Sequence, residues 1–161
     1  DCGAAEGIFA LLTRPAARHV YCIEPLPEFQ RSLQLTFRQD PAVSVVPVAL
    51  GDAPGETSIP DNQGGQLRVP VDTLDALRAR WNTPIHYLKG DLEGQEMAAL
   101  RGARHTIAEC KPKIAFACYH QGQDVEEMMA FLREFNPQYH FRLKGFSWCL
   151  GVRQPMLLHA W

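Results

Sequence analysis

The chain has 161 residues, of which 46% are hydrophobic and 21% charged, and this length and composition fit one globular domain. Sixteen Lys and Arg against eighteen Asp and Glu give a net charge of -2, so the chain lacks the basic excess typical of nucleic-acid-binding proteins. No apolar run approaches the roughly 20 residues that a membrane span needs, and the composition excludes a disordered chain.

Strand-like runs alternate with helix-like stretches along the chain. In chain order we expect a helix at Ile8–Thr13, a strand at His19–Glu24, a helix at Leu26–Arg38 and a strand at Val43–Leu50, in which Pro47 requires an edge or bulge position. There follow short strands at Thr57–Ile59 and Leu67–Val71, a helix capped by Asp72 or Thr73, a strand at Ile85–Asp91, a helix at Gln95–Glu109, a strand at Lys113–Tyr119, a helix capped by Asp124, and strands at Tyr139–Leu143 and Met156–Ala160.

This alternation predicts an α/β fold with a mainly parallel sheet, and we assign residues 1–161 to one domain. In such sheets, ligands bind beyond the carboxyl ends of the strands. The residues that follow each strand are therefore the candidates for function.

The five cysteines include no C-x-x-C pair, which disfavours a zinc ribbon or a thioredoxin-type motif. Cys22 and Cys118 lie in apolar strand-like runs and are expected to be buried free thiols. Unpaired cysteines of this kind favour a reducing, cytoplasmic location.

A turn of small residues, Asp1 to Gly7, precedes the first helix, and Glu24 ends the next strand 21 residues after Gly3. Such a turn exposes backbone N–H groups to a ligand, and an acid at that offset can accept both hydroxyls of a ribose. The pattern indicates a nucleoside-containing cofactor, although tight packing alone also explains small residues. The leading Asp1 would repel a pyrophosphate and attract an ammonium group, which favours S-adenosylmethionine over NAD.

Six ordered segments resemble the FkbM-type S-adenosylmethionine-dependent methyltransferases over nearly the whole chain. The matching residues are Asp1, Gly3, Ala4 and Gly7; Glu24 and Pro25; Ala49 to Asp52 with Gly55; Val71 to Asp75; Lys89, Asp91, Glu93, Gly94 and Glu96; and Tyr119, His120, Asp124 and Asn136 to Tyr139. Two residues depart from the pattern, because Ala5 stands where Asn is usual and Gly90 where a β-branched residue is usual. We expect Gly90 to loosen its strand.

The resemblance implies a Rossmann-like, doubly wound sheet of the class I methyltransferase type and S-adenosylmethionine as the cofactor. It implies these site residues: Gly3, Ala4, Ala5 and Gly7 around the methionine part, Asp1 at its ammonium, Glu24 with Pro25 at the ribose, Leu50 and Asp52 near the adenine, Asp91 at the methionine end, and Glu93 toward the acceptor. In that fold Asp1 is the last residue of the central first strand. We therefore expect that the 161 residues are the C-terminal part of a longer chain.

Several of these acids have simpler interpretations. Asp1 can be an ordinary strand-end carboxylate, Glu24 a helix N-terminal acid and Asp52 a turn residue. Glu93 and Glu96 can stabilise the first turn of the following helix, and we favour that role for Glu96. Lys89 is expected to pair with a neighbouring carboxylate.

His120 follows the fifth strand of the matching segments and is our candidate for the general base, since an imidazole can take the proton of a hydroxyl acceptor. Asp91 is the second candidate catalytic residue. A surface position or an acceptor contact remains open for His120. A metal held by Asp91, Glu93 and His120 is conceivable, but their spacing forms no recognised ligand motif, and we predict no metal.

The leading hypothesis is an O-methyltransferase that acts on a hydroxyl of a sugar, glycan or natural product. A nicotinamide-dependent dehydrogenase and a non-catalytic cofactor-binding module are the alternatives. We predict that the acceptor is bound by two loop-rich segments, Gly55–Val71 and Phe146–Pro155. These contain Asn62, Gln63, Arg68, Trp148 and Arg153.

Overall fold

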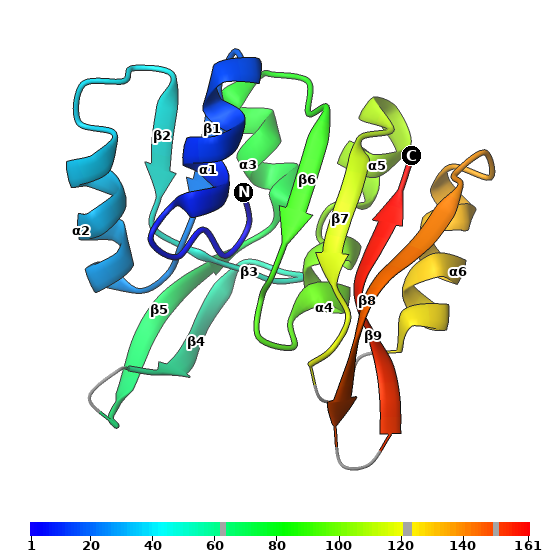
Figure 1. The fold of residues 1–161 in the computed structure, drawn as a ribbon. Coiled ribbons are helices and arrows are strands. Elements are labelled where there is room, and N and C mark those ends of the chain that lie inside the picture. The colour runs from blue at the N-terminus through cyan, green and yellow to red at the C-terminus, as the bar shows by residue number, and fades with distance from the viewer. Residues whose placement is uncertain (62–63, 121–123, 150–151) are drawn as a thin grey trace.

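The computed structural model describes residues 1–61, 64–120, 124–149 and 152–161, which form a mixed α/β fold (Figure 1). The elements in chain order are α1 Ile8–Thr13, the 3-10 turn η1 Arg14–Ala16, β1 Val20–Ile23, α2 Pro27–Thr36, β2 Val43–Val46, β3 Ala49–Leu50, β4 Gly55–Pro60 and β5 Gln66–Asp72. They continue with α3 Leu74–Trp81, β6 Tyr87–Gly90, α4 Glu96–Arg101, α5 Arg104–Cys110, β7 Lys113–Ala117, α6 Val125–Phe135, β8 Phe141–Cys149 and β9 Val152–Ala160.

The strands form three hydrogen-bonded groups: β1-β2, β3-β5-β4 and β6-β7-β9-β8. Cys2 lies between the first and the last group, because it forms parallel bridges with Ile23 of β1 and with Gly90 of β6. Among the described strand pairs, three are parallel and three are antiparallel. The pairs β1-β2 and β6-β7 and both bridges of Cys2 are parallel, and the antiparallel pairs come from the β4–β5 and β8–β9 hairpins and from β9 beside β7.

The strand predicted at Val43–Leu50 is divided at Pro47 into β2 and β3. Proline has no N–H to donate to a strand partner, and here the next residue, Val48, donates back to the carbonyl of Val46 at 3.0 Å. After this turn the chain leaves β1, and β3 pairs instead with β5. The strand therefore ends before Pro47, so the missing N–H leaves no gap in its hydrogen bonds.

The helix predicted at Gln95–Glu109 is also divided, into α4 and α5, at Gly102. A Cβ atom on Gly102 would lie 2.0 Å from the carbonyl oxygen of Gly51, and the Gly102 carbonyl accepts the N–H of Asp75 at 2.9 Å. The break therefore accompanies a backbone contact between this helical segment and the end of β3. A helical pattern in the sequence carries no sign of such a contact.

The helices pack into two separate hydrophobic clusters. One contains residues of α3, α4, α5 and α6, and the other contains residues of α1 and α2. The first cluster contains Ile23 together with Leu100, Met128 and residues of β6, β7 and β9. The second contains Cys22 with Ala10, Leu33 and Phe37. Neighbouring residues of a strand point to opposite faces, so Cys22 and Ile23 show that helices cover both faces of the sheet at β1.

Gly90 is a regular member of β6, paired with Phe116 of β7 and bridged to Cys2. A Cβ atom at this position would lie 2.6 to 2.7 Å from three ring carbons of Phe116. The aromatic ring therefore fills the space that a β-branched side chain would need. Phe116 thus replaces the packing that a side chain at position 90 would provide, and β6 is not loosened there as expected.

Cys22 and Cys118 are buried free thiols, as predicted, and Cys2 and Cys110 are free as well. Burial raises the pKa of the Cys118 thiol to about 11. None of the helices in the described part of the chain combines the length and the apolar character that crossing a bilayer requires.

Candidate active site

The turn before α1 is shaped by three residues with positive φ: Gly3 at +69°, Ala5 at +45° and Gly7 at +90°. A Cβ atom on Gly3 would lie 1.9 Å from the Asp91 carbonyl oxygen, and one on Gly7 would lie 2.6 Å from Leu33 Cδ2. Close packing within the protein thus accounts for both glycines. The same packing places the turn against the residue that follows β6.

Ala5 adopts a left-handed conformation, which costs an alanine roughly 1 kcal/mol and suits asparagine or glycine better. We expect Ala5→Gly to raise the free energy of unfolding by about 1 kcal/mol, because the strain disappears. Ala4→Gly is the matched control: Ala4 is buried and has no positive φ, so a loss of about 0.5–1 kcal/mol is expected there. Urea unfolding of both variants measures the two signs, and a loss of stability in Ala5→Gly would contradict the prediction.

Glu24 is only 4% exposed and joins this turn to α2. Its Oε2 accepts the N–H of Ala5 and its Oε1 accepts the N–H of Leu26, each at 2.9 Å. Burial raises the pKa of the Glu24 carboxyl, and the two backbone donors offset part of that shift. Half-buried Pro25 is fixed by Gln30, whose amide donates to the carbonyls of Glu24 and Pro25. Each carboxylate oxygen keeps a further lone pair for a ligand hydroxyl.

Asp1 and Lys89 form an ion pair behind the turn, with 3.2 Å between Lys89 Nζ and Asp1 Oδ1. This confirms the expected pairing of Lys89, whose Nζ also donates to the Gly3 carbonyl at 2.5 Å. Burial lowers the pKa of Lys89. Beyond this ion pair, neither oxygen of the buried Asp1 carboxylate accepts a hydrogen bond among the described residues, so lone pairs remain for an ammonium group.

Leu50 and Asp52, which the resemblance places near an adenine, differ in their surroundings. Leu50 is buried in the hydrophobic cluster that contains Cys2 and Ile23. Asp52 is exposed in the turn between β3 and β4. Leu50 therefore belongs to the hydrophobic core, while Asp52 lies at the surface, as its interpretation as a turn residue also predicts.

Acidic side chains surround His120 at the carboxyl ends of β6 and β7. Its Nδ1 lies 2.8 Å from Glu96 Oε1, and its Nε2 lies 3.6 Å from Asp91 Oδ1 and 3.5 Å from Glu93 Oε2. Tyr119 donates its hydroxyl to Asp91 Oδ1 at 3.3 Å, and burial with the nearby Asp91 carboxylate raises the pKa of Tyr119 to about 12. We call Asp91, Glu93, Glu96, Tyr119 and His120 the acid cluster.

Glu96 has a contact that the sequence interpretation missed. It is the first residue of α4, as a helix-stabilising acid would be, but its side chain is 0% exposed and reaches both His120 and the N–H of Leu92. Glu93, by contrast, has a side chain that is 90% exposed. Asp91 and Glu96 belong to the same motif of the resemblance, one directly after β6 and the other at the start of α4. This spacing is the signal in the sequence that could have placed Glu96 in the site.

Asp91, Glu96 and His120 each place one ligand atom within 4.8 Å of the other two, so they can hold a metal ion. The metal set considered from the sequence named Glu93, whereas the buried carboxylate in this arrangement belongs to Glu96. Glu96 Oε2 and His120 Nε2 are buried and have no hydrogen-bond partner within the described ranges. Acids and imidazole suit first-row dications, and they equally suit a proton-transfer pair.

A family model for the methyltransferase FkbM domain matches residues 1–143. The chain belongs to the FkbM methyltransferase family. The methyltransferase FkbM from Methylobacillus flagellatus KT has a similar solved structure, with a TM-score of 0.76 and 24% sequence identity. The match covers all of this chain and 42% of that one, so the present chain spans less than half of that protein's length.

A solved precorrin 8W decarboxylase from Methanobacterium thermoautotrophicum is also similar, with a TM-score of 0.58 and 15% identity over 99% of this chain and 78% of that one. At these identities the two structures show a shared fold and nothing of the substrate. No curated protein is similar enough to the chain to match it.

Two hairpins of this FkbM family member project from the end toward which the arrows of β6 and β7 point (Figure 1). They are β4–β5 and β8–β9, which contain most of the two segments predicted to bind the acceptor. Arg68 is exposed and pairs with Glu56, and Trp148 is 76% exposed. Asn62, Gln63 and the side chain of Arg153 lie outside the described residues.

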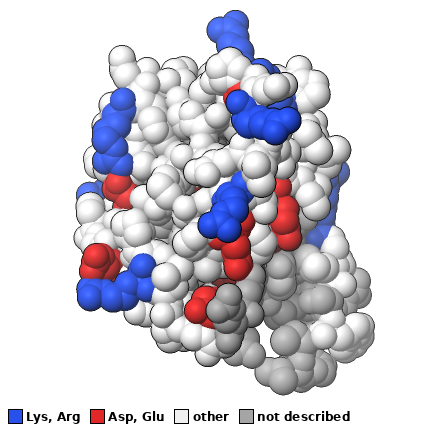
Figure 2. Space-filling view, turned by 90° about the vertical axis from the view of Figure 1, so that its left-hand side faces the viewer, with Lys and Arg blue, Asp and Glu red and all other residues white. Residues whose placement is uncertain are grey.

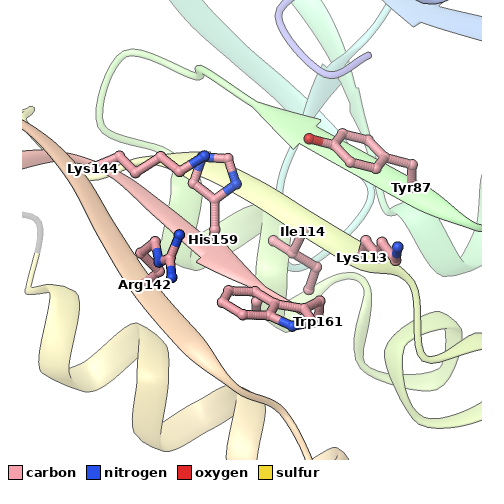
Figure 3. A pocket seen from close by; sticks show the side chains of 8 residues that line it. Tyr87, Lys113, Ile114, Arg142, Lys144, His159 and Trp161 are labelled. Atoms are coloured by element: carbon pink, nitrogen blue, oxygen red, sulfur yellow. The ribbon is translucent and has the colours of Figure 1, made fainter.

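A basic pocket of about 290 Å³ lies at the opposite end of the same strands (Figure 3). Its lining includes Tyr87 and Lys113, which begin β6 and β7, and Arg142, Lys144 and His159 from the β8–β9 hairpin. Burial, with Lys144 and Arg142 nearby, lowers the pKa of His159. Because Asp91 and His120 follow the other ends of β6 and β7, this pocket is separate from the acid cluster.

Acidic and basic side chains lie side by side on the face of the molecule in Figure 2. The described part of that face has no broad area of a single charge, in keeping with the near-balanced composition of the chain.

Proposed function

We propose that residues 1–161 form a methyltransferase domain that moves a methyl group from S-adenosylmethionine to a hydroxyl of a sugar, glycan or natural product. One observation carries the proposal: the Gly3–Gly7 turn and the acid cluster meet at Asp91. The Asp91 N–H donates to the Cys2 carbonyl at 3.1 Å, and the Asp91 carbonyl touches Gly3. A cofactor at the turn would therefore be adjacent to the groups that can receive the acceptor's proton.

The sheet order supports a Rossmann-like, doubly wound fold of the class I methyltransferase type. Reading across the bridges of Cys2, the order is β2-β1-Cys2-β6-β7-β9-β8, with β9 antiparallel to its neighbours. Helices on both faces of β1 fit the same proposal. The free buried thiols support our proposal of a reducing, cytoplasmic location.

The residues present fit S-adenosylmethionine, because the Asp1 carboxylate accepts no hydrogen bond among the described residues beyond its ion pair with Lys89, and a carboxylate at this turn would repel a pyrophosphate. Asp1 would receive the ammonium group, and Glu24 would accept the ribose hydroxyls. The small side chains of Gly3, Ala4, Ala5 and Gly7 would leave room for the methionine part, with Leu50 and Asp52 toward the adenine. When bound, this cofactor supplies a methyl group on a sulfonium, which is already a good leaving group.

The protein's remaining task is to align the acceptor and to remove its proton. We assign removal of the acceptor's proton to His120. We assign alignment of the acceptor at the methionine end of the cofactor to Asp91, whose carboxylate accepts a hydrogen bond from Tyr119. Exposed Glu93 lies 3.5 Å from the same imidazole and is a candidate contact for the acceptor.

Isothermal calorimetry with S-adenosylhomocysteine and with NAD tests the cofactor. We expect S-adenosylhomocysteine to bind and NAD to give no heat. Glu24→Gln should weaken S-adenosylhomocysteine at least tenfold, since a carboxylate acceptor of two hydroxyls becomes an amide with one oxygen. Glu134→Gln, an exposed change on α6, should leave the affinity unaltered.

The same calorimetry, combined with a methyl-transfer assay, separates the alternatives. NAD binding without S-adenosylhomocysteine binding would replace the proposal by a dehydrogenase. Binding of S-adenosylhomocysteine without methyl transfer to any member of a broad panel of hydroxyl compounds would support a non-catalytic module.

A further inference from the structure

We propose that Glu96 is a positioning residue that holds His120 in the tautomer able to take a proton from the acceptor. In this arrangement Nδ1–H donates to Glu96, and the lone pair of Nε2 is directed toward the reacting groups. The inference deepens the proposed function and rests on it, but its test below needs no methyl transfer.

Because the Glu96 carboxylate is buried, the groups that donate hydrogen bonds to it determine where the His120 proton lies. The Glu96 side chain is fully buried, and a buried carboxylate is stable only where hydrogen-bond donors or charges compensate for lost water. Oε1 accepts the N–H of Leu92 at 2.8 Å and lies 2.8 Å from His120 Nδ1. A carboxylate can only accept, so Nδ1 must carry the proton in this contact.

The proton on Nδ1 determines the role of the other ring nitrogen. In the neutral imidazole Nε2 is then the acceptor. It is buried, has no hydrogen-bond partner in the described part of the chain, and lies 3.6 Å from Asp91 Oδ1 and 3.5 Å from Glu93 Oε2. An acceptor hydroxyl beside Asp91 would therefore meet a nitrogen whose lone pair is available.

Two contacts fix the orientation of the ring. Glu96 holds one edge, and the ring of Tyr119 lies against it with 4.2 Å between centroids. Tyr119 is itself tied to Asp91. These contacts hold the imidazole in one orientation, which lowers the cost of aligning it with an acceptor.

The negative charge of Glu96 also matters after the proton moves. The acceptor's O–H bond breaks as an N–H bond forms on Nε2, and the oxygen's electron pair forms the new bond to the methyl carbon. The S–C electron pair stays on sulfur, and the imidazolium later releases its proton to solvent. The buried carboxylate offsets the positive charge of that imidazolium, as in hydrolase triads.

Nitrogen-15 NMR of the histidine-labelled chain, saturated with S-adenosylhomocysteine, tests this directly. We expect the His120 signals of the wild type to report Nδ1–H. Leu92 N–H and His120 Nδ1 both contact the same oxygen, Glu96 Oε1. In Glu96→Gln an amide oxygen in that place keeps both contacts and the Nδ1–H tautomer, whereas Glu96→Leu removes the acceptor and should abolish the preference for Nδ1–H. Glu126→Gln, an exposed change at the start of α6, should leave the tautomer unchanged. An Nε2–H tautomer in the wild type would overturn the proposal without any variant.

Kinetics with an accepted hydroxyl compound give the second readout. We expect Glu96→Leu to lower kcat at least 100-fold with little change in the KM for the cofactor, and His120→Ala to lower kcat by a similar factor. The double variant should be no slower than His120→Ala, because both changes remove one function. Equal kcat in Glu96→Leu and wild type would reject the role of Glu96.

The competing use of the same atoms is metal binding by Asp91, Glu96 and His120. A first-row dication that is retained on purification, and whose removal by EDTA shifts the His120 nitrogen signals, would make Glu96 a ligand and overturn the positioning role. Failure of S-adenosylhomocysteine binding with the Nδ1–H tautomer intact would instead refute the proposed function and leave the pair standing.

Discussion

Gly3→Ala is expected to lower the free energy of unfolding by about 4 kcal/mol and to disrupt the turn that we assign to the cofactor. Left-handed φ accounts for roughly 1–2 kcal/mol of this loss. The larger part comes from the new methyl group, which would lie 1.9 Å from the Asp91 carbonyl oxygen. That oxygen belongs to the backbone and cannot move aside as a flexible side chain would.

Relief would require residues 2 and 91 to separate, with loss of the hydrogen bond from Asp91 N–H to the Cys2 carbonyl. Gly55→Ala is the matched control, since a Cβ there has nothing within 4 Å and its φ is not positive. Urea unfolding should show a change of at most about 0.5 kcal/mol for Gly55→Ala. Equal midpoints for the two variants would show that the Gly3 contact is not a constraint.

The second large effect is expected at Gly90, where a valine would enter the space of the Phe116 ring. Overpacking of a buried site costs about 1–3 kcal/mol, and we expect Gly90→Val to fall at the upper end because three ring carbons lie within 2.7 Å of the Cβ position. Both residues are buried and paired in neighbouring strands, so neither can move into solvent.

Phe116→Leu provides the test of this cause. The smaller side chain alone should destabilise the fold, but the pair Gly90→Val with Phe116→Leu should be more stable than the sum of the single effects by at least about 1 kcal/mol. A double-mutant cycle from urea unfolding measures that coupling. Strict additivity would mean that the ring does not replace the missing β-branched side chain.

The sequence predicts most elements because their signals are local. The stripe of apolar residues in α2 and the caps of Thr73 and Asp124 depend on neighbours within one or two turns, and both caps are present. The position of Glu24 directly after β1 could be predicted for the same reason, because it follows from order along the chain.

The missed features depend on contacts between distant residues. Glu96 resembles any first-turn acid until its contact with His120, 24 residues later, is known. The break at Gly102 depends on Gly51, and the packing of Gly90 depends on Phe116. Periodicity and composition describe a residue's neighbours along the chain, so neither can identify which backbone or ring will occupy the adjacent space.

The ion pair and hydrogen bonds of Lys89 bear on the order in which this protein folds. Lys89 Nζ contacts the carbonyl of Gly3 from 86 positions along the chain, and β6 supplies the partners of Cys2. Contacts of such long range form late, because the intervening chain must be brought together first. During synthesis residues 1–7 emerge before residues 89–91, yet they reach their final shape only when those residues have followed them. The turn assigned to the cofactor is therefore made before β6 and completed only after it.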